Sequence, residues 1–261
     1  MSAHTELRSL RQRLHAWLAS APGSVLVQAE QSRSVQALPN LFGYHLIQLG
    51  TLPDADLLAS SRISHRAVVE VDRPQGAGAC SAVLFCDASA LPFAADSVDV
   101  VVLPHVLEFE EDPHQVLREV ERVLIAEGHV LLFGFNPWSL FGLWRLFLGW
   151  RGEPPWCGSF FRLGRVKDWL RLLGFDIVRV HALFFRPPLR HPGLLRRLAF
   201  VEKLGGHWWP YFGGVYCVIA KKRLVSMTPV KMQWKMRRSL IAAGIAEPST
   251  RRAEPGMSPQ P

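Results

Sequence analysis

The chain has 261 residues, 49% of them hydrophobic, and is long enough for one α/β domain of about 200 residues with tails. Its formal net charge is +8, but residues 221–261 contain nine Lys or Arg against two acids, which leaves the rest of the chain close to neutral. This composition argues against a second complete domain and against a strongly basic folded core.

Cysteine usage and the N-terminal sequence indicate the compartment. Four cysteines are scattered along the chain: Cys80, Cys86, Cys157 and Cys217. They form no Cys-x-x-Cys pair, so neither a disulfide framework nor a metal site is expected. Residues 1–7 lack the apolar core of a secretory signal, and Arg145 and Arg151 interrupt the most apolar stretch. We expect a cytoplasmic protein and leave open a peripheral contact with the inner membrane.

Periodicity predicts helices and strands in a regular order. An amphipathic helix is expected over residues 5–20 and a second over 29–40. Five short apolar runs are typical of strands buried on both faces of a parallel sheet: Tyr44 to Leu49, Arg66 to Val71, Ala82 to Cys86, Val98 to Leu103 and His129 to Phe135. Three further elements follow them: a helix from Gly164 to Leu173, a strand from Phe175 to Leu183 and a strand from Gly214 to Ala220.

A further helix has clear start and stop signals. Asp112 can cap free N–H groups, and Pro113 suits the first helical position. The apolar residues after them recur at helical spacing. Gly128 is expected to end this helix.

Three consecutive segments have a pattern that resembles a known family. Residues 84–93 read Leu-Phe-Cys-Asp-Ala-Ser-Ala-Leu-Pro-Phe, residues 99–101 read Asp-Val-Val, and residues 122–124 read Arg-Val-Leu shortly before a glycine. The block resembles the class I S-adenosylmethionine-dependent methyltransferases of the type 11, or UbiE-like, branch. The similarity is strong over residues 82–135 and fainter over 41–184. Residues 42–50 and 134–137 resemble a YafS-type bacterial subgroup.

This resemblance implies a fold and a cofactor. The expected fold is α/β, a seven-stranded, mostly parallel doubly wound (Rossmann-like) sheet whose last strand is antiparallel, with an aromatic-rich insert after strand five. The expected cofactor is S-adenosylmethionine. We divide the chain into an N-terminal helical extension (1–40), a methyltransferase-like domain (41–223, with an insert at 136–163) and a basic, largely disordered tail (224–261).

The loop after the first strand departs from the family pattern. The family places acid-x-Gly-x-Gly-x-Gly here, whereas this chain reads Gln48-Leu-Gly-Thr-Leu-Pro-Asp54 and keeps only Gly50. Two interpretations are open. Either the loop is remodelled and Gln48 or Asp54 contacts the ammonium group of the cofactor, or the loop has lost the ligand and merely connects two elements.

Three residues are predicted to contact the nucleoside part of the cofactor. Asp72 ends the second strand about 20 residues after Gly50, where a carboxylate binds ribose hydroxyls in nucleotide-binding folds. Its alternative is a surface acid. By resemblance, Asp87 and Ala88 lie at the adenine edge, and the alternative for Asp87 is a turn residue that caps its own backbone.

His105 follows the fourth strand, where the resembled enzymes place the residue nearest the transferred methyl group. A neutral imidazole there could remove a proton from the acceptor, so His105 is the candidate catalytic base. The alternative is a histidine that closes the strand by a backbone hydrogen bond. Glu108 could orient the imidazole, although a solvated position in the acidic run 108–112 is favoured.

The insert after the fifth strand is dense in aromatic residues. Five are spaced three apart: Trp138, Phe141, Trp144, Phe147 and Trp150. A helix that is apolar nearly all round is covered by protein, contacts a membrane surface through residues 138–150, or roofs an apolar pocket. Core packing has the largest prior of these three.

Together these features favour S-adenosylmethionine-dependent methyl transfer to a small, hydrophobic acceptor. The alternative is a methyltransferase-derived pseudoenzyme that acts as a binding or membrane-surface scaffold. Nucleic acid is ranked low as a partner, because most of the positive charge lies in the C-terminal residues.

Overall fold

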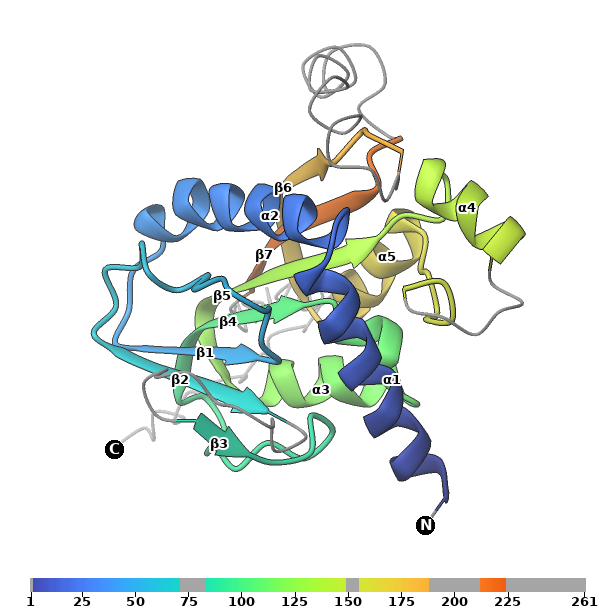
Figure 1. The fold of residues 1–261 in the computed structure, drawn as a ribbon. Helices are drawn as coiled ribbons and strands as arrows, with labels where there is room; N and C mark the ends of the chain where they lie inside the picture. Colours follow the sequence, from blue (N-terminus) through green and yellow to red (C-terminus); the bar gives the residue numbers. More distant parts are fainter. Residues whose placement is uncertain (1, 71–82, 149–154, 188–211, 224–261) are drawn as a thin grey trace, which may run out of the picture. The chain divides into compact units, whose positions relative to one another are not determined.

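A seven-stranded sheet forms the centre of the fold in the computed structural model, which describes residues 2–70, 83–148, 155–187 and 212–223 (Figure 1). The strands follow one another as β1 (His45–Leu49), β2 (His65–Glu70), β3 (Val83–Phe85), β4 (Val98–Pro104), β5 (Leu124–Phe135), β6 (Phe175–Leu183) and β7 (Val215–Lys222). Their order across the sheet is β3-β2-β1-β4-β5-β7-β6. Only β7 runs antiparallel to its neighbours β5 and β6. The predicted fold class is therefore confirmed.

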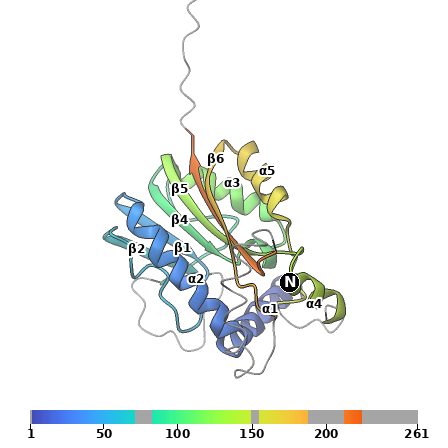
Figure 2. The same ribbon diagram turned by 90° about the horizontal axis from the view of Figure 1, so that it is seen from above.

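Five helices accompany the sheet in the described ranges: α1 (Ser2–Ala19), α2 (Gly23–Ala37), α3 (Pro113–Val123), α4 (Leu140–Leu148) and α5 (Leu163–Leu172). Two short 3-10 turns, η1 (Leu38–Asn40) and η2 (Leu107–Phe109), precede β1 and follow β4. Figure 2 shows α1 and α2 on one side of the sheet and α3 and α5 on the other. Residues Met1–Leu224 form one compact unit, and Val225–Pro261 fall outside the described residues.

Alternation along each strand produces two hydrophobic cores. In β4, Val100 and Val102 belong to the core beneath α1 and α2, whereas Val101 and Leu103 belong to the core beneath α3 and α5. All four side chains are fully buried. Because both faces are covered, the strands are continuous apolar runs, and this is why the sequence located them.

The connection between β1 and β2 contains no helix. Residues 50–64 form turns whose apolar side chains Leu52, Leu57 and Leu58 are buried in the same core as Leu26 of α2. Helix α2, which precedes β1 in the chain, therefore covers much of the face that a helix between these strands would otherwise cover. The N-terminal helices contribute core residues to the sheet domain.

Two expected helix boundaries were wrong. Helix α2 begins at Gly23 rather than at residue 29. Helix α3 starts as predicted, because Asp112 Oδ1 accepts hydrogen bonds from His114 N (3.0 Å) and Gln115 N (3.1 Å). It ends at Val123 instead of near Gly128, because Leu124 adopts an extended conformation and pairs with Val98 at the start of β5.

Candidate functional site

The candidate site lies where β1, β2, β3 and β4 end. These four strands are adjacent and parallel, so the residues after their carboxyl ends meet at one edge of the sheet. Open α/β sheets bind ligands at this edge. Gly50, Asp87 and His105 follow β1, β3 and β4 there. Asp72 was predicted from the same logic and lies outside the described residues.

Gly50 forms a turn that leaves space beside the end of β4. Its φ is +78°, a backbone conformation that favours glycine. A Cβ at this position would meet no atom nearer than Val106 Cγ2 at 3.6 Å. The turn is held from behind, since Gly50 N donates to Val69 O at 2.7 Å and Gln48 Nε2 donates to Gly50 O at 2.8 Å.

The structure gives the other two polar residues of this loop different surroundings. Gln48 is buried, and its amide nitrogen points at the carbonyl of its own loop, so it supports the turn from below. Asp54 is exposed and has a φ of +53°. Contact of either side chain with the ammonium group of a cofactor stays a prediction.

Asp87 and Ala88 follow the short edge strand β3. Cys86 N donates to Glu70 O at 3.0 Å, which ties the start of this loop to the end of β2. Asp87 is exposed, and its Oδ1 accepts a hydrogen bond from Ser89 N at 2.9 Å. This bond is the one expected for a turn residue, and it also fixes the loop beside the site. Ala88 is buried in the core beneath α3 and α5.

The Leu-Pro-Phe turn that follows is held by helix α3. Arg122 donates to Phe93 O at 2.9 Å and to Leu91 O at 3.0 Å, while Glu119 Oε2 accepts from Leu91 N at 3.1 Å. Arg122 and Glu119 also form an ion pair at 2.8 Å. The arginine of the Arg-Val-Leu motif therefore binds the backbone of the Leu-Pro-Phe motif, and this contact orders the loop after β3.

His105 is buried at the end of β4. Its Nε2 lies 2.6 Å from Glu30 Oε1 of α2, and its Nδ1 lies 3.5 Å from Glu108 Oε1 of η2. Its ring stacks on Phe135, with ring centroids 4.0 Å apart. Its backbone N donates to Phe133 O at 3.1 Å. This is the backbone hydrogen bond expected for a histidine that closes the strand.

These neighbours determine the protonation of His105. Burial by itself would lower the pKa, but the carboxylates of Glu30 and Glu108 outweigh burial and raise the pKa to about 10. The imidazole is then a cation at neutral pH and has no lone pair with which to accept a proton. A catalytic base needs the neutral imidazole, which this raised pKa makes scarce at neutral pH, and the role of His105 as base stays a prediction.

Sequence reasoning missed Glu30 and misplaced Glu108. Glu30 is fully buried on the inward face of α2 with Leu26 and Val27. An acidic residue on an apolar helix face was the sequence signal that could have indicated a buried ion pair. Glu108 is buried rather than solvated, because its Oε1 accepts a hydrogen bond from Phe135 N at 2.6 Å. Burial also raises the pKa of Tyr216 well above its usual value, with the charge of Glu108 adding to the effect.

The aromatic insert is partly core and partly surface. Phe141 of α4 is fully buried and packs against Trp17, Phe135, Trp156 and Phe184. Other side chains of α4 are exposed: Leu143 by 50%, Leu146 by 78% and Phe147 by 65%. Trp150 lies outside the described residues. Among the helices that the structure describes, none is long and apolar enough to cross a membrane.

Comparison with known proteins shows the family. Residues 55–132 match the model of a methyltransferase domain, type 11. The chain is 34% identical over 206 residues to YafS of Escherichia coli strain K12, and the match covers 78% of this chain and 80% of that protein. The chain belongs to the type 11 methyltransferase family.

Solved structures agree with the fold. A chain of the complex between the Haloferax volcanii Trm112 methyltransferase activator and a methyltransferase has a TM-score of 0.56 at 15% identity, covering 81% of this chain and 98% of that one. An S-adenosylmethionine-dependent methyltransferase from Mesorhizobium loti has a TM-score of 0.51 at 15% identity, covering 74% and 98%. These structures support the fold, and the family model supports assignment of the chain as a methyltransferase. S-adenosylmethionine is the cofactor expected for it.

The described residues fit this cofactor in two places. The space around Gly50 would admit a ligand close to the backbone, and a Cβ would intrude on it. The Asp87 loop is held in a fixed conformation by its own turn bond and by Arg122. Only the first of the family's glycines, Gly50, is present in this loop.

Proposed function

We propose that the protein transfers a methyl group from S-adenosylmethionine to a small, hydrophobic acceptor at the carboxyl edge of β1 to β4. The observation that supports this most directly is the Gly50 turn, whose positive φ and free space lie beside the end of β4. When bound, S-adenosylmethionine supplies an activated methyl group that an acceptor can displace in line.

Each residue of the proposed cofactor site has a separate task. Gly50 allows close approach of the backbone, and Gln48 holds that turn through its bond to the Gly50 carbonyl. Asp87 forms the wall at the adenine, with its loop fixed by its turn bond, and the buried Ala88 holds this loop against the core. Asp72 is proposed to accept hydrogen bonds from the ribose.

We assign His105 a positioning role instead of proton removal. Its cation lies between Glu30 of α2 and Glu108 of η2, and so it fixes these two elements at the end of β4. Methyl transfer from a sulfonium depends mainly on alignment of the reacting atoms. An arrangement that orients the acceptor without a base is compatible with that chemistry.

The hydrophobic character of the acceptor is inferred from the aromatic residues on the same side of the fold. Phe135, at the end of β5, stacks on His105 and is 5.1 Å from Phe160, centroid to centroid. Helix α4 adds exposed Leu143 and Leu146 nearby in the chain. Phe135 and Phe160 are buried in the core, so an apolar acceptor, or a membrane surface from which it is taken, would meet the exposed side chains of α4. The comparisons give no support to a non-enzymatic scaffold.

A matched pair of glycine variants tests the cofactor site. Gly50 and Gly174 both have a positive φ, +78° and +82°. A Cβ would meet no atom nearer than 3.6 Å at Gly50 and no atom within 4 Å at Gly174. Alanine should therefore impose a similar backbone strain at both, about 1–2 kcal/mol. Only Gly50→Ala should weaken binding of S-adenosylmethionine, by roughly tenfold or more in isothermal titration calorimetry, which corresponds to about 1.4 kcal/mol.

Transfer itself is tested by incubating the protein with labelled S-adenosylmethionine and a cell extract, and following label in extracted small molecules. Wild-type protein should transfer label, and Gly50→Ala should do so more slowly. Absence of any binding heat and of any thermal stabilisation by millimolar cofactor would contradict the proposal, because a ligand that binds the folded state must raise its stability.

A further inference from the structure

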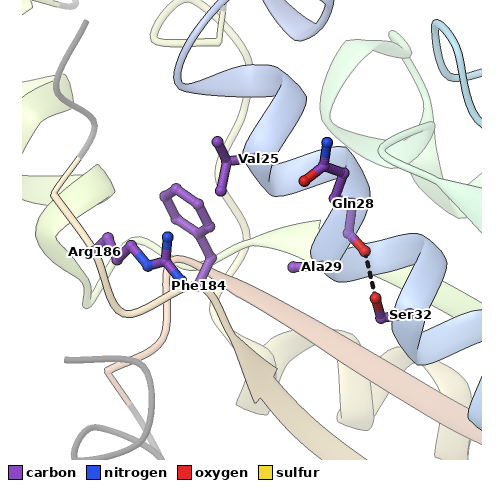
Figure 3. A pocket seen from close by; sticks show the side chains of 6 residues that line it. All are labelled: Val25, Gln28, Ala29, Ser32, Phe184 and Arg186. Carbon is purple, nitrogen blue, oxygen red and sulfur yellow. Dashed lines mark hydrogen bonds between the residues drawn. The ribbon is translucent and has the colours of Figure 1, made fainter. Parts of the chain in front are cut away.

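A cavity lies between helix α2 and the residues that follow β6. Its volume is about 240 Å³, and Figure 3 shows Phe184 and Arg186 on one side of it and α2 on the other. Six residues line it: Val25, Gln28, Ala29, Ser32, Phe184 and Arg186. The wall therefore combines an aromatic ring and aliphatic groups with polar and cationic ones. Small-molecule sites have this mixed composition.

Basic residues lie on the same two elements as this cavity. Arg33 follows Ala29 of the cavity wall by one turn of α2, and so it lies on the same stripe of the helix. Ser32, on the cavity wall, precedes Arg33 in the chain. Burial raises the pKa of the Cys217 thiol in β7, and the positive charge of Arg33 opposes this increase. Cys217 is paired in the sheet with His181 of the edge strand β6. Arg179, two residues before His181 in β6, points to the same face of the sheet, and the charges of Arg33 and Arg179 both act on His181. We call Arg33, Arg179 and His181 the basic cluster.

This basic cluster has no acidic partner in the part of the chain that the structure describes. Arg33 donates one hydrogen bond, to Gln36 at 2.6 Å, while its buried Nε has no acceptor among the described atoms. Neither Arg33 nor Arg179 forms an ion pair with a described residue. By contrast, Arg122 and Lys222 each contact a carboxylate.

The like charges are close enough to affect one another. Burial lowers the pKa of His181, and the charges of Arg33 and Arg179 lower it further. Burial likewise lowers the pKa of Arg33, with a contribution of the same sign from Arg179. An anion placed among them would remove this repulsion and supply the missing acceptor.

We propose that this cavity and the basic cluster beside it bind a small amphipathic organic anion. Its carboxylate, sulfonate or phosphate group lies among Arg33, Arg179 and His181, and its apolar part lies in the cavity against Phe184 and Val25. This site is separate from the loops after β1 and β3, and the inference does not depend on methyl transfer.

The test uses the fluorescent apolar anion 1-anilinonaphthalene-8-sulfonate as a probe, titrated into the full-length protein. Octanoate should displace it, whereas octanol, which has the same chain without the charge, should not at equal concentration. Arg33→Gln combined with Arg179→Gln should weaken probe binding roughly ten- to hundredfold, the range expected when charge-assisted hydrogen bonds are lost.

Two further variants make this test specific. Arg118→Gln is the matched control, because Arg118 is also a helical arginine bonded to a glutamine three residues away, Gln115, but lies on α3. It should leave the affinity unchanged. Ala29→Trp should fill the cavity and abolish binding without removing any charge. If the arginine pair proves poorly folded, Arg33→Lys with Arg179→Lys retains the charges and should keep binding within a few fold.

Equal probe affinity in wild type and in a folded Arg33→Gln, Arg179→Gln variant would overturn the proposal, as would displacement by octanol as effective as that by octanoate. The same variants should bind S-adenosylmethionine with wild-type affinity. A loss of anion binding with intact cofactor binding therefore separates this site from the cofactor site.

Discussion

At the residue scale, His105 is the most constrained side chain of the candidate site. It is 2% exposed, has a φ of +53° and lies between two carboxylates from different elements. A buried carboxylate is unfavourable without a counter-charge, so removal of the imidazole would leave Glu30 and Glu108 to repel each other. The residue therefore acts on stability and on the position of α2.

The raised pKa of His105 predicts a pH-dependent loss of stability. A group whose pKa rises on folding stabilises the protein fully below its unfolded pKa of about 6.5, and this contribution falls as the pH rises through about 10. Between about pH 6.5 and 9.5, wild-type protein should lose up to about 1.4 kcal/mol of unfolding free energy per pH unit more than His105→Gln. Urea unfolding at several pH values measures this difference.

The control is His114→Gln, at an exposed position, which should keep the wild-type slope. Identical slopes for wild type and His105→Gln would contradict the assigned cation.

Asp87 provides a second prediction at this scale. Asp87→Ala should weaken binding of S-adenosylmethionine by about 1–3 kcal/mol if its carboxylate accepts a charge-assisted bond from the cofactor. The matched control is Asp56→Ala, because Asp56 Oδ1 makes the same kind of turn bond, to Leu58 N at 2.9 Å. Calorimetry should show no effect for Asp56→Ala. An unaltered affinity in Asp87→Ala would move the adenine contact to the backbone of the loop.

The sequence could indicate these residues but not their partners. The Asp87 segment was recognisable because its motif is local. The pair between His105 and Glu30 joins residues 75 positions apart, and no local pattern predicts such a contact. The sequence suggested His105 as a base, whereas in the structure Glu30 of α2 supplies a counter-charge that favours the buried imidazolium.

At the scale of elements, helix α4 has a buried and an exposed face that the sequence could not separate. Phe141 is core, and Phe141→Ala should cost about 3–5 kcal/mol of unfolding free energy. Leu143 and Leu146 are 50% and 78% exposed, so Leu143→Glu with Leu146→Glu should leave stability nearly unchanged. If α4 contacts membranes, this double variant should lose co-sedimentation with liposomes that the wild type shows.

The control for that experiment is Leu172→Glu. Leu172, on α5, is 85% exposed, and its replacement should not alter co-sedimentation. Wild-type protein that stays in the supernatant would contradict membrane contact and leave the exposed face of α4 to a protein or acceptor contact.

Elements were predictable where the pattern was unambiguous. Apart from the start of β5, which lies five residues before the predicted His129, the strands were located to within about two residues, because β-branched apolar runs of this length have few alternatives. The predicted end of α3 was wrong because Leu124 continues the apolar run in an extended conformation. The register shift between Val98 and Val100 allows β5 to include Gly128. Periodicity does not encode such a change from helix to strand within an apolar run.

At the scale of the whole molecule, helix α2 connects distant parts of the sheet. Its inward face contributes Leu26 and Val27 to the core and Glu30 to the pair with His105. Deletion of residues 1–40, which the sequence marks as an extension, should therefore expose core and abolish cooperative thermal unfolding, as monitored by circular dichroism. A fragment 41–261 that still melts cooperatively and binds S-adenosylmethionine would show that the helices are an appendage.

The position of β7 also has a consequence for how the protein is made. This strand is the last in the sequence, yet it lies between β5 and β6 and bonds to both. Until Val215–Lys222 has been made and has left the ribosome, the edges of β5 and β6 that bind β7 are unpaired. A nascent chain that stalls before residue 215 is therefore expected to depend on chaperones. Once residues 215–222 have left the ribosome, β7 can pair with both β5 and β6.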